Sequence, residues 1–160
     1  LIEKVGPDVV RYFFIMRGMN THLNFDMELA KDESDENPVF YLQYAYARLC
    51  NILKHAEGLG HILNSKADVS LLDHELEIQL IQKLMAFPEK VRKALTSLEP
   101  QSIAIYLQET AAVFHRYYAQ ERVVTEDKDK TAARLVLVKG AQIVLGNGLN
   151  LLGINAPERM

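Results

Sequence analysis

The apolar residues of this chain recur mostly at spacings of three and four, which is the period of an amphipathic α-helix and not of a β-strand. The clearest example begins at Asn37-Pro38, where Asn can cap a helix and Pro suits its first turn. One apolar stripe then runs along the segment and consists of Leu42, Ala45, Leu49, Ile52 and Ala56. Gly58 and Gly60 are typical of a helix end. The pattern therefore predicts a helix over residues 37–58.

Similar patterns predict helices on both sides of this segment. Pro7 begins a predicted helix that ends at Gly18, and residues 24–32 favour a short helical turn. Asp73 is the predicted cap of another helix. Pro88 interrupts that helix, so we expect either a kink or two shorter helices there.

The C-terminal part predicts two long helices. The first begins at Pro100, and its apolar stripe is formed by Ile103, Leu107, Ala111, Phe114 and Tyr118. A polar loop follows at residues 125–130. Residues 131–149 are then apolar on nearly all sides, which is typical of a helix in the middle of a bundle. The sequence Gly-Asn-Gly at 146–148 is expected to weaken the end of that helix.

These elements together predict an all-α protein, a helical bundle preceded by a helical connector. The connector comprises residues 1–36 and the bundle residues 37–160. A chain of 160 residues has the size of a single domain. It opens with Leu1 and not Met, so we expect it to be a piece of a longer protein.

Charge and composition narrow the classes of protein that remain. The net charge of −3 argues against a general nucleic-acid binder, but six acidic residues lie between Asp26 and Glu36, and the rest of the chain carries a net +2. Any contact with RNA must therefore depend on placed groups and not on a broad field. The acidic stretch is expected to be a solvated connector. The single Cys50 among apolar neighbours suits a cytoplasmic protein, and no apolar run is long enough to span a membrane.

No residues with recognisable covalent chemistry are present. The five histidines show no HExxH motif and no close pairing with Cys, so no metal site is expected. The acidic stretch lacks the glycine and the later ligands of a calcium loop, and no phosphate-binding GxxxxGK[ST] loop occurs. Neither Ser nor Cys lies in a nucleophile motif. The residues themselves thus predict no catalytic site and no bound cofactor.

One face of the predicted 37–58 helix carries side chains that a core does not require. These residues, at spacings of three and four, are Tyr41, Tyr44, Arg48, Asn51 and His55. Aromatic residues at a bundle edge are commonly half-buried and hydrogen-bonded, with an arginine as ion-pair partner. The alternative is a platform on which unpaired bases stack, with the guanidinium beside a phosphate or a base edge. The pattern alone leaves both interpretations open.

A second aromatic and basic cluster lies in "FHRYYAQERVV", residues 114–124. Tyr118 prolongs the apolar stripe of its helix, yet its place at the helix end is expected to leave the hydroxyl and one ring face near solvent. Arg116 and Arg122 suit either solvation at the surface or contact with phosphate. This cluster, like the face of the 37–58 helix, combines aromatic residues with arginines. Both segments therefore suggest an aromatic and basic surface at a helix end.

Four stretches of the sequence, taken in order, resemble a known family. They are "GPDVVRYFFIMRGMNTHLNFDMELA", "NPVFYLQYAYARL", "FHRYYAQERVV" and "ARLVLVKGAQIVLGNGLNLLGINAPERM". Their order and spacing are similar to those in the C-terminal part of arginyl-tRNA synthetases. The resemblance spans essentially the whole chain, and the combination of "NPVFYLQYAYAR" with the closing "LLGINAPERM" is its most specific element.

The resemblance implies a class I synthetase cut after its catalytic domain. Residues 1–36 would be the linker after the Lys-Met-Ser-Lys-Ser region, and residues 37–160 the helical anticodon-binding domain of the DALR type. The motifs that bind ATP and arginine lie upstream, so this fragment is expected to hold no cofactor and to be inactive alone. The full-length enzyme would attach arginine to tRNA(Arg) with ATP and Mg²⁺. Its expected partners are the anticodon loop and the upstream catalytic domain of the same chain, and we expect a cytoplasmic monomer.

The resemblance also implies which residues touch the tRNA. In the family, the aromatic residue at the position of Tyr44 stacks near the 3′ side of the anticodon loop, whereas the residues at Tyr118 and Met160 approach the anticodon, in which the central cytosine is a main identity base. Cytosine offers an N4 donor, which a terminal carboxylate or a backbone carbonyl can accept. The predicted tRNA-binding residues are Tyr41, Tyr44, Arg48, Asn51, His115, Tyr118, Arg122 and Met160. Tyr46, where a histidine is frequent, and Gln120-Glu121 depart from the family's commonest pattern.

A helical bundle that docks a partner helix is the alternative function. It would use the tyrosine-rich face formed by Tyr41, Tyr44 and Tyr46. The two functions differ in their response to salt. RNA binding weakens steeply as salt is added because it releases counterions, whereas an apolar docking surface does not weaken in this way.

Overall fold

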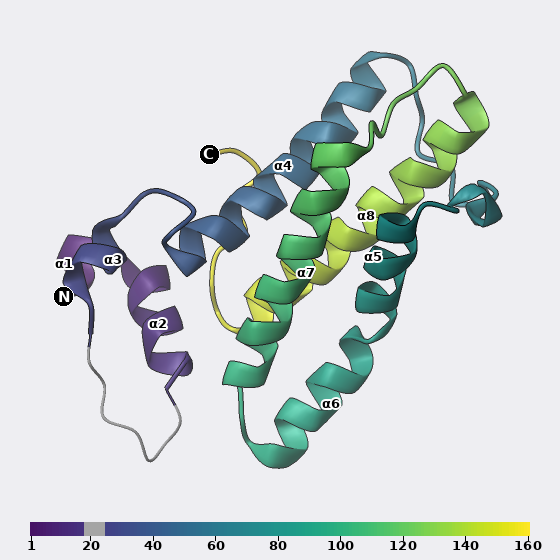
Figure 1. Cartoon of the computed structure of the whole chain (residues 1–160). Helices are drawn as coiled ribbons and strands as arrows, with labels where there is room; N and C mark the ends of the chain where they lie inside the picture. The colour runs from purple at the N-terminus through teal and green to yellow at the C-terminus, as the bar shows by residue number, and fades with distance from the viewer. Residues whose placement is uncertain (18–24) are drawn as a thin grey trace.

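The structure is a computed structural model of the 160-residue chain and describes residues 1–17 and 25–160. All regular elements of these residues are helices, which confirms the predicted all-α class. In chain order they are α1 (Ile2–Val5), α2 (Pro7–Ile15), α3 (Met27–Lys31), α4 (Pro38–Gly58), the short 3₁₀-helix η1 (Val69–Leu71), α5 (Glu75–Met85), α6 (Phe87–Ser97), α7 (Gln101–Gln120) and α8 (Lys128–Leu151). The long helices α4, α7 and α8 pack on one another, and α5 and α6 pack on α7 (Figure 1).

Helix α4 begins where the sequence predicts it. The Oδ1 atom of Asn37 accepts a hydrogen bond from the backbone N–H of Val39 at 3.0 Å, and Pro38 occupies the first turn. Asn37 is itself buried, and its Nδ2 donates to the carbonyl of Asp32 at 2.9 Å. All five residues of the predicted apolar stripe are buried. The stripe therefore anchors α4 on α7 and α8 and leaves the tyrosine and arginine face of α4 outside the core.

The cap of α5 differs from the predicted one. His74, and not Asp73, is the N-cap: its Nδ1 accepts a hydrogen bond from the second residue of the helix at 3.2 Å, and Glu77 accepts one from the backbone N–H of His74 at 3.0 Å. Asp73 lies one position too early for this exchange and instead forms an ion pair with α8. The expected interruption near Pro88 is confirmed as two separate helices that meet at Ala86.

Helix α8 begins earlier and ends later than predicted. The Oδ1 atom of Asp127 accepts hydrogen bonds from the backbone N–H groups of Asp129 and Lys130, both at 3.0 Å. The last residues of the predicted polar loop therefore form the first turn of the helix. At the other end α8 continues through residues 146–148 to Leu151. Gly-Asn-Gly therefore does not end the helix, and the predicted end at residue 149 is two residues too early.

The two glycines near the end of α8 are positions of close packing. A Cβ at Gly148 would lie 2.3 Å from Cδ2 of Leu107 on α7, and one at Gly146 would lie 2.9 Å from the ring of Tyr46 on α4. Since interiors are close-packed, only residues without a side chain let α8 approach both neighbours this closely. The predicted central position of α8 is confirmed, because it packs against α4, α5 and α7.

The N-terminal helices lie against one end of the bundle (Figure 1). Tyr12 on α2 is buried and belongs to the same core as the residues of α4 and α7. The Oδ2 atom of Asp8 accepts hydrogen bonds from Nε2 of Gln43 at 3.0 Å and from the backbone N–H of Asn155 at 3.2 Å. The segment before α4 thus touches both α4 and the C-terminal tail. The short helical turn predicted in it is α3, while the predicted helix end at Gly18 lies outside the described residues.

Candidate nucleic-acid interface

A groove of about 370 Å³ lies where α4, the end of α7 and the C-terminal tail meet. Its lining consists of Tyr44, Ala47, Arg48, Asn51, Ile52, His55, Tyr118, Val123, Val124 and Met160. The groove brings together five of the eight residues predicted to bind tRNA, from three parts of the chain. Its volume is within the range of about 300–1,000 Å³ that is typical of small-ligand sites.

Arg48 lies between the two exposed tyrosine rings of this groove. Its Cζ is 4.5 Å from the ring centroid of Tyr44 and 5.3 Å from that of Tyr118, and it also donates a hydrogen bond to the Tyr44 hydroxyl. Tyr44 is 41% exposed and Tyr118 is 39% exposed. Contact with two rings restricts the guanidinium by cation–π attraction. The groove therefore presents two partly exposed rings with one cation between them. The spacing on α4 predicts that Tyr44 and Arg48 lie on one side of the helix, whereas Tyr118 comes from α7.

His115 contacts the rings of both Tyr44 and Tyr41, and it therefore connects the groove with Tyr41. Its ring is stacked on Tyr44 at a centroid distance of 6.1 Å and tilted against Tyr41 at 5.0 Å. Burial, followed by the charge of Arg48, lowers the pKa of His115 to about 4, against a smaller opposing effect of Asp35. The imidazole is therefore neutral at pH 7 and offers a stacking ring instead of a cation. His115 and Tyr41 line a neighbouring hollow and not the groove itself.

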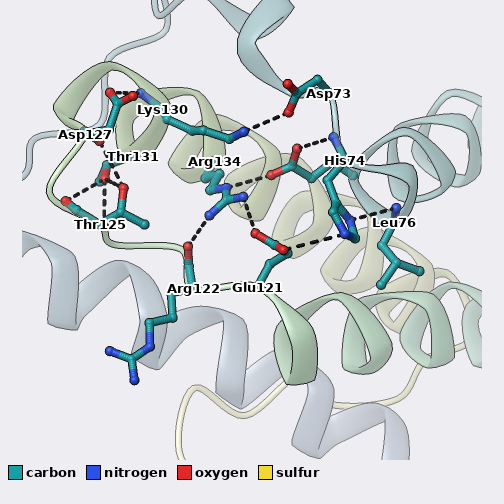
Figure 2. Close-up of polar contacts among 11 residues, drawn as sticks. Asp73, His74, Leu76, Glu121, Arg122, Thr125, Asp127, Lys130, Thr131 and Arg134 are labelled. Atoms are coloured by element: carbon teal, nitrogen blue, oxygen red, sulfur yellow. Dashed lines mark hydrogen bonds and ion pairs between the residues drawn. The ribbon is translucent and has the colours of Figure 1, made fainter.

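Arg122 is the one predicted residue that lies apart from both hollows. Its side chain is exposed and points away from the polar contacts around it (Figure 2). The next two residues, Val123 and Val124, line the groove in its place. Sequence reasoning missed them because an apolar pair after a basic residue carries no chemical signal of its own.

A buried ion network holds residues 121 and 122, which lie between α7 and α8 (Figure 2). Arg134 on α8 is 4% exposed, and its Nε donates to Oε1 of Glu77 at 2.6 Å, a carboxylate that is fully buried. The same guanidinium donates through Nη2 to Oε2 of Glu121 and through Nη1 to the carbonyl of Arg122, both at 2.5 Å. Arg134 thereby connects α5, α8 and the segment that continues into Val123 of the groove. Arg134 stands in an apolar run between Ala132 and Val138, and a charged residue in such a run is the sequence signal that could have pointed to the network.

The C-terminal tail is fixed on α4 beside the groove. Nζ of Lys54 donates to Oε2 of Glu158 at 2.7 Å, and Nε2 of Gln43 donates to the carbonyl of Asn155 at 3.0 Å. Met160 is 51% exposed and is part of the groove lining, as is Tyr118. The tail and the end of α7 therefore meet at the same site.

Within residues 1–17 and 25–160, no three His, Cys, Asp or Glu side chains gather closely enough to hold a metal ion. In the same part of the chain, no helix combines the length and the apolar character needed to cross a membrane.

The described residues thus form an all-α bundle whose groove combines two partly exposed rings, an arginine between them and Met160. The chain belongs to the DALR anticodon binding domain family, whose model matches residues 42–160.

Known relatives agree with this family. The chain is 47% identical to the arginine–tRNA ligase of Heliobacterium modesticaldum, an alignment that covers 100% of this chain and 30% of that protein. It is 48% identical to the arginine–tRNA ligase of Salinibacter ruber, with 100% of this chain and 28% of that protein covered. Among solved structures, the arginyl-tRNA synthetase of Thermus thermophilus superposes with a TM-score of 0.83 at 30% identity, over 98% of this chain and 27% of that one. The chain thus spans less than a third of the length of the curated relatives that it matches.

Proposed function

We propose that this chain is the anticodon-binding part of an arginine–tRNA ligase and that its groove receives unpaired bases of the tRNA(Arg) anticodon loop. The observation that carries the proposal is the pair of exposed rings, Tyr44 and Tyr118, on either side of Arg48. Unpaired RNA bases are recognised by stacking on aromatic rings and on guanidinium planes. The family of the chain supports the same partner.

Each predicted residue of the groove has a role that its position supports. Tyr44 and Tyr118 supply stacking, which favours binding without selecting a base. Arg48 supplies a cation for a phosphate or a base edge, and the exposed amide of Asn51 can donate and accept. Met160 lies where the tail can select the base that enters, since a backbone oxygen there would accept from the N4 amino group of cytosine.

The remaining activity belongs to the longer enzyme in this proposal. An upstream catalytic domain of the same chain would attach arginine to tRNA(Arg) with ATP and Mg²⁺, in the cytoplasm and as a monomer. The relatives named arginine–tRNA ligase, of which this chain matches less than a third, support this assignment. The fragment itself supplies tRNA binding.

The alternative of a partner helix docked on three tyrosines has less support. Tyr46 packs against Gly146 on α8, whereas Tyr41 and Tyr44 lie beside His115. The three rings therefore do not form one exposed face, and the spacing agrees with this, because residues two apart on a helix such as Tyr44 and Tyr46 point to different sides. A salt-insensitive complex with a helical peptide would favour this alternative.

A titration of the 160-residue chain with an arginine anticodon stem-loop tests the proposal. We expect tighter binding of this stem-loop than of a non-cognate one. We also expect the logarithm of the binding constant to fall linearly with the logarithm of salt concentration, by about 0.7 for each phosphate that is contacted. Fluorescence anisotropy at several salt concentrations measures both quantities. Equal binding of the two loops, or no salt dependence, would contradict the proposal.

Deletion of Met160 is expected to reduce discrimination more than binding. The variant lacks the groove residue at the chain end, but it keeps Tyr44, Tyr118 and Arg48. We expect the preference for cytosine at the central anticodon position to fall by roughly 10-fold, the size of one base-specific hydrogen bond. The measurement compares stem-loops that differ at this base only. An equal loss of affinity for all of them would show that Met160 selects no base.

A further inference from the structure

The C-terminal tail is also held from the N-terminal side of the chain, by two residues of α2. The carboxylate of Asp8 contacts Asn155 three times: Oδ2 accepts from the backbone N–H at 3.2 Å and from Nδ2 at 3.1 Å, and Oδ1 accepts from Nδ2 at 3.3 Å. Nη1 of Arg11, which lies three positions further along α2, donates to the carbonyl of Gly153. These hydrogen bonds of Asp8 and Arg11 are the α2–tail contact.

The tail reaches α2 through a defined turn at the end of α8. Gly153 has a φ of +67°, which is in the left-handed region that favours glycine, and a Cβ there would lie 3.2 Å from Nη1 of Arg11. Ile154 follows and is buried, and its backbone N–H donates to the carbonyl of Leu149 at 2.9 Å. The start of the tail is therefore fixed, and Asp8 contacts the residue that comes directly after it.

Asp8 also contacts α4, the helix that forms one side of the groove. Nε2 of Gln43 donates to Oδ2 of Asp8 at 3.0 Å and to the carbonyl of Asn155 at 3.0 Å. The carboxylate therefore connects α2, α4 and the tail at one point. Hydrogen bonds to a charged group are stronger than those between neutral groups, so this point holds the tail more firmly than a neutral contact would.

Met160 follows Asn155 by five positions and lies at the groove, and the tail between them runs back beside α4 (Figure 1). A free stretch of five residues can reach about 17 Å, so its last residue stays in one place only if the stretch is held. A further hold on it is the ion pair of Lys54 with Glu158, but both residues are exposed, and such pairs contribute little. The place of Met160 therefore depends mainly on what holds Asn155.

We propose that Asp8 is a positioning residue for base selection: through Asn155 it keeps Met160 at the groove, and α2 thereby sets how well the groove distinguishes the base that enters. This inference rests on the proposed function, in which the tail selects the base. It adds a residue that lies outside the groove and before residues 42–160, the range that the family model matches. In the longer enzyme of the proposed function, the segment that follows the catalytic domain would thus hold the part of the bundle that selects the base.

The variant Asp8→Ala in the 160-residue chain tests this role, because it removes every acceptor of the side chain. We expect the preference for cytosine at the central anticodon position to fall by about 3-fold or more, up to the roughly 10-fold expected for deletion of Met160. The variant keeps Tyr44, Arg48 and Tyr118, so the affinity for stem-loops with another base at this position should stay within about 2-fold. Asp8→Asn keeps one acceptor oxygen and should retain most of the preference. Anisotropy titrations with stem-loops that differ at this base only measure both quantities.

Deletion of Met160 distinguishes positioning from a general effect. If Asp8 acts through the tail end, Asp8→Ala lowers the preference no further in a chain that already lacks Met160, because both changes act on one contact. An equal further fall in that chain would overturn the inference. Glu3→Ala is the matched control for charge, since Glu3 is an exposed acid on α1 in the same N-terminal segment, and we expect its preference to be unchanged. Equal falls for Glu3→Ala and Asp8→Ala would also overturn the inference.

Asn155→Ala tests the same contact from the tail and carries the test if circular dichroism shows that Asp8→Ala does not fold. Asn155 is exposed, and alanine removes the two hydrogen bonds of Nδ2 but keeps the backbone N–H that donates to Asp8. We expect the preference for cytosine to fall by about 2-fold or more. An unchanged preference in a folded Asn155→Ala chain would count against the role of Asp8.

Carboxypeptidase digestion of the free chain reports on the tail without RNA. We expect Met160 to be released faster from Asp8→Ala than from the unmodified chain and from Glu3→Ala, because a tail that is no longer held enters a protease site more readily. Equal rates of release would show that Asp8 does not hold the tail and would overturn the inference, whatever the RNA titrations give.

The outcomes for Asp8 and for the proposed function are separate. An unmodified chain that does not prefer the arginine stem-loop overturns the proposed function, and the role of Asp8 in base selection with it. An unmodified chain that prefers this stem-loop, together with an Asp8→Ala variant of unchanged preference, overturns the role of Asp8 alone.

Discussion

The variant Arg134→Met is expected to lower the free energy of unfolding by about 3–5 kcal/mol, the cost that is typical when one partner of a buried ion pair is removed. Glu77 is 0% exposed, and its Oε1 accepts the hydrogen bond of Arg134 Nε at 2.6 Å. Methionine fills similar space but donates no hydrogen bond. It therefore leaves a buried carboxylate that must either stay charged without a partner or take up a proton.

Urea unfolding followed by circular dichroism measures this decrease as a shift of the midpoint at unchanged slope. Replacement of both partners distinguishes the missing charge partner from altered packing. The double variant Glu77→Gln with Arg134→Met removes the unpaired charge, and its amide oxygen can still accept from the backbone N–H of His74. We expect the double variant to be more stable than Arg134→Met alone. The prediction would be wrong if the two variants were equally unstable, or if Arg134→Met unfolded like the unmodified chain.

Lys130→Met is the control for this prediction. Lys130 lies one turn before Arg134 on α8 and forms an ion pair with Asp73 at 2.7 Å, but Asp73 is exposed. Exposed pairs contribute little to stability because water and salt screen them. We therefore expect a change far smaller than that of Arg134→Met, although both substitutions remove a positive charge from the same face of the helix.

The buried network also holds part of the lining of the groove in position. The guanidinium of Arg134 accepts no hydrogen bonds and donates three, of which two go to Glu121 and to the carbonyl of Arg122. These two residues directly precede Val123, which is buried and lines the groove. A charged side chain in the middle of the bundle thus fixes the position of one wall of the surface on which the rings lie.

Local patterns predicted most of the helices and the composition of the α4 face. Periodicity and the residues Asn37, Pro38 and Pro88 act within a few residues of chain, so they can be read without tertiary structure. The spacing of Tyr44, Arg48 and Asn51 places them on one side of a helix for the same reason. The structure confirms that the apolar stripe of α4 is buried, and these three side chains share one groove.

The features that the sequence did not reveal depend on residues far apart in the chain. Gly148 looks like a helix breaker until the close approach of Leu107, 41 positions earlier in the sequence, gives the absent side chain a packing role. Arg134 looks like a surface charge until Glu77, which is 57 residues away, becomes its partner. The choice between Asp73 and His74 as a cap is a difference of one position, which propensity alone does not resolve, since either side chain can accept a hydrogen bond.

Tyr118→Ala is expected to weaken binding of the arginine anticodon stem-loop by about 5- to 150-fold, which corresponds to roughly 1–3 kcal/mol for one stacked base. The ring of Tyr118 is 39% exposed, so alanine removes a surface that a base can cover. The inner side of the ring stacks on Phe114 at a centroid distance of 6.0 Å, and Arg48 lies 5.3 Å from its centroid. The substitution therefore removes both the stacking face and one of the two rings that restrict the arginine.

Tyr118→Phe separates stacking from other effects, because it keeps the ring and removes only the hydroxyl. We expect phenylalanine to retain the affinity within a few-fold and alanine to reduce it, with the circular dichroism of both variants unchanged. Anisotropy titrations at one fixed salt concentration compare them directly. If phenylalanine and alanine reduced the affinity equally, the phenol hydroxyl and not the ring face would hold the RNA. If neither variant weakened binding, no base would stack on Tyr118, and the groove between α4 and α7 would not be the surface that receives the anticodon loop.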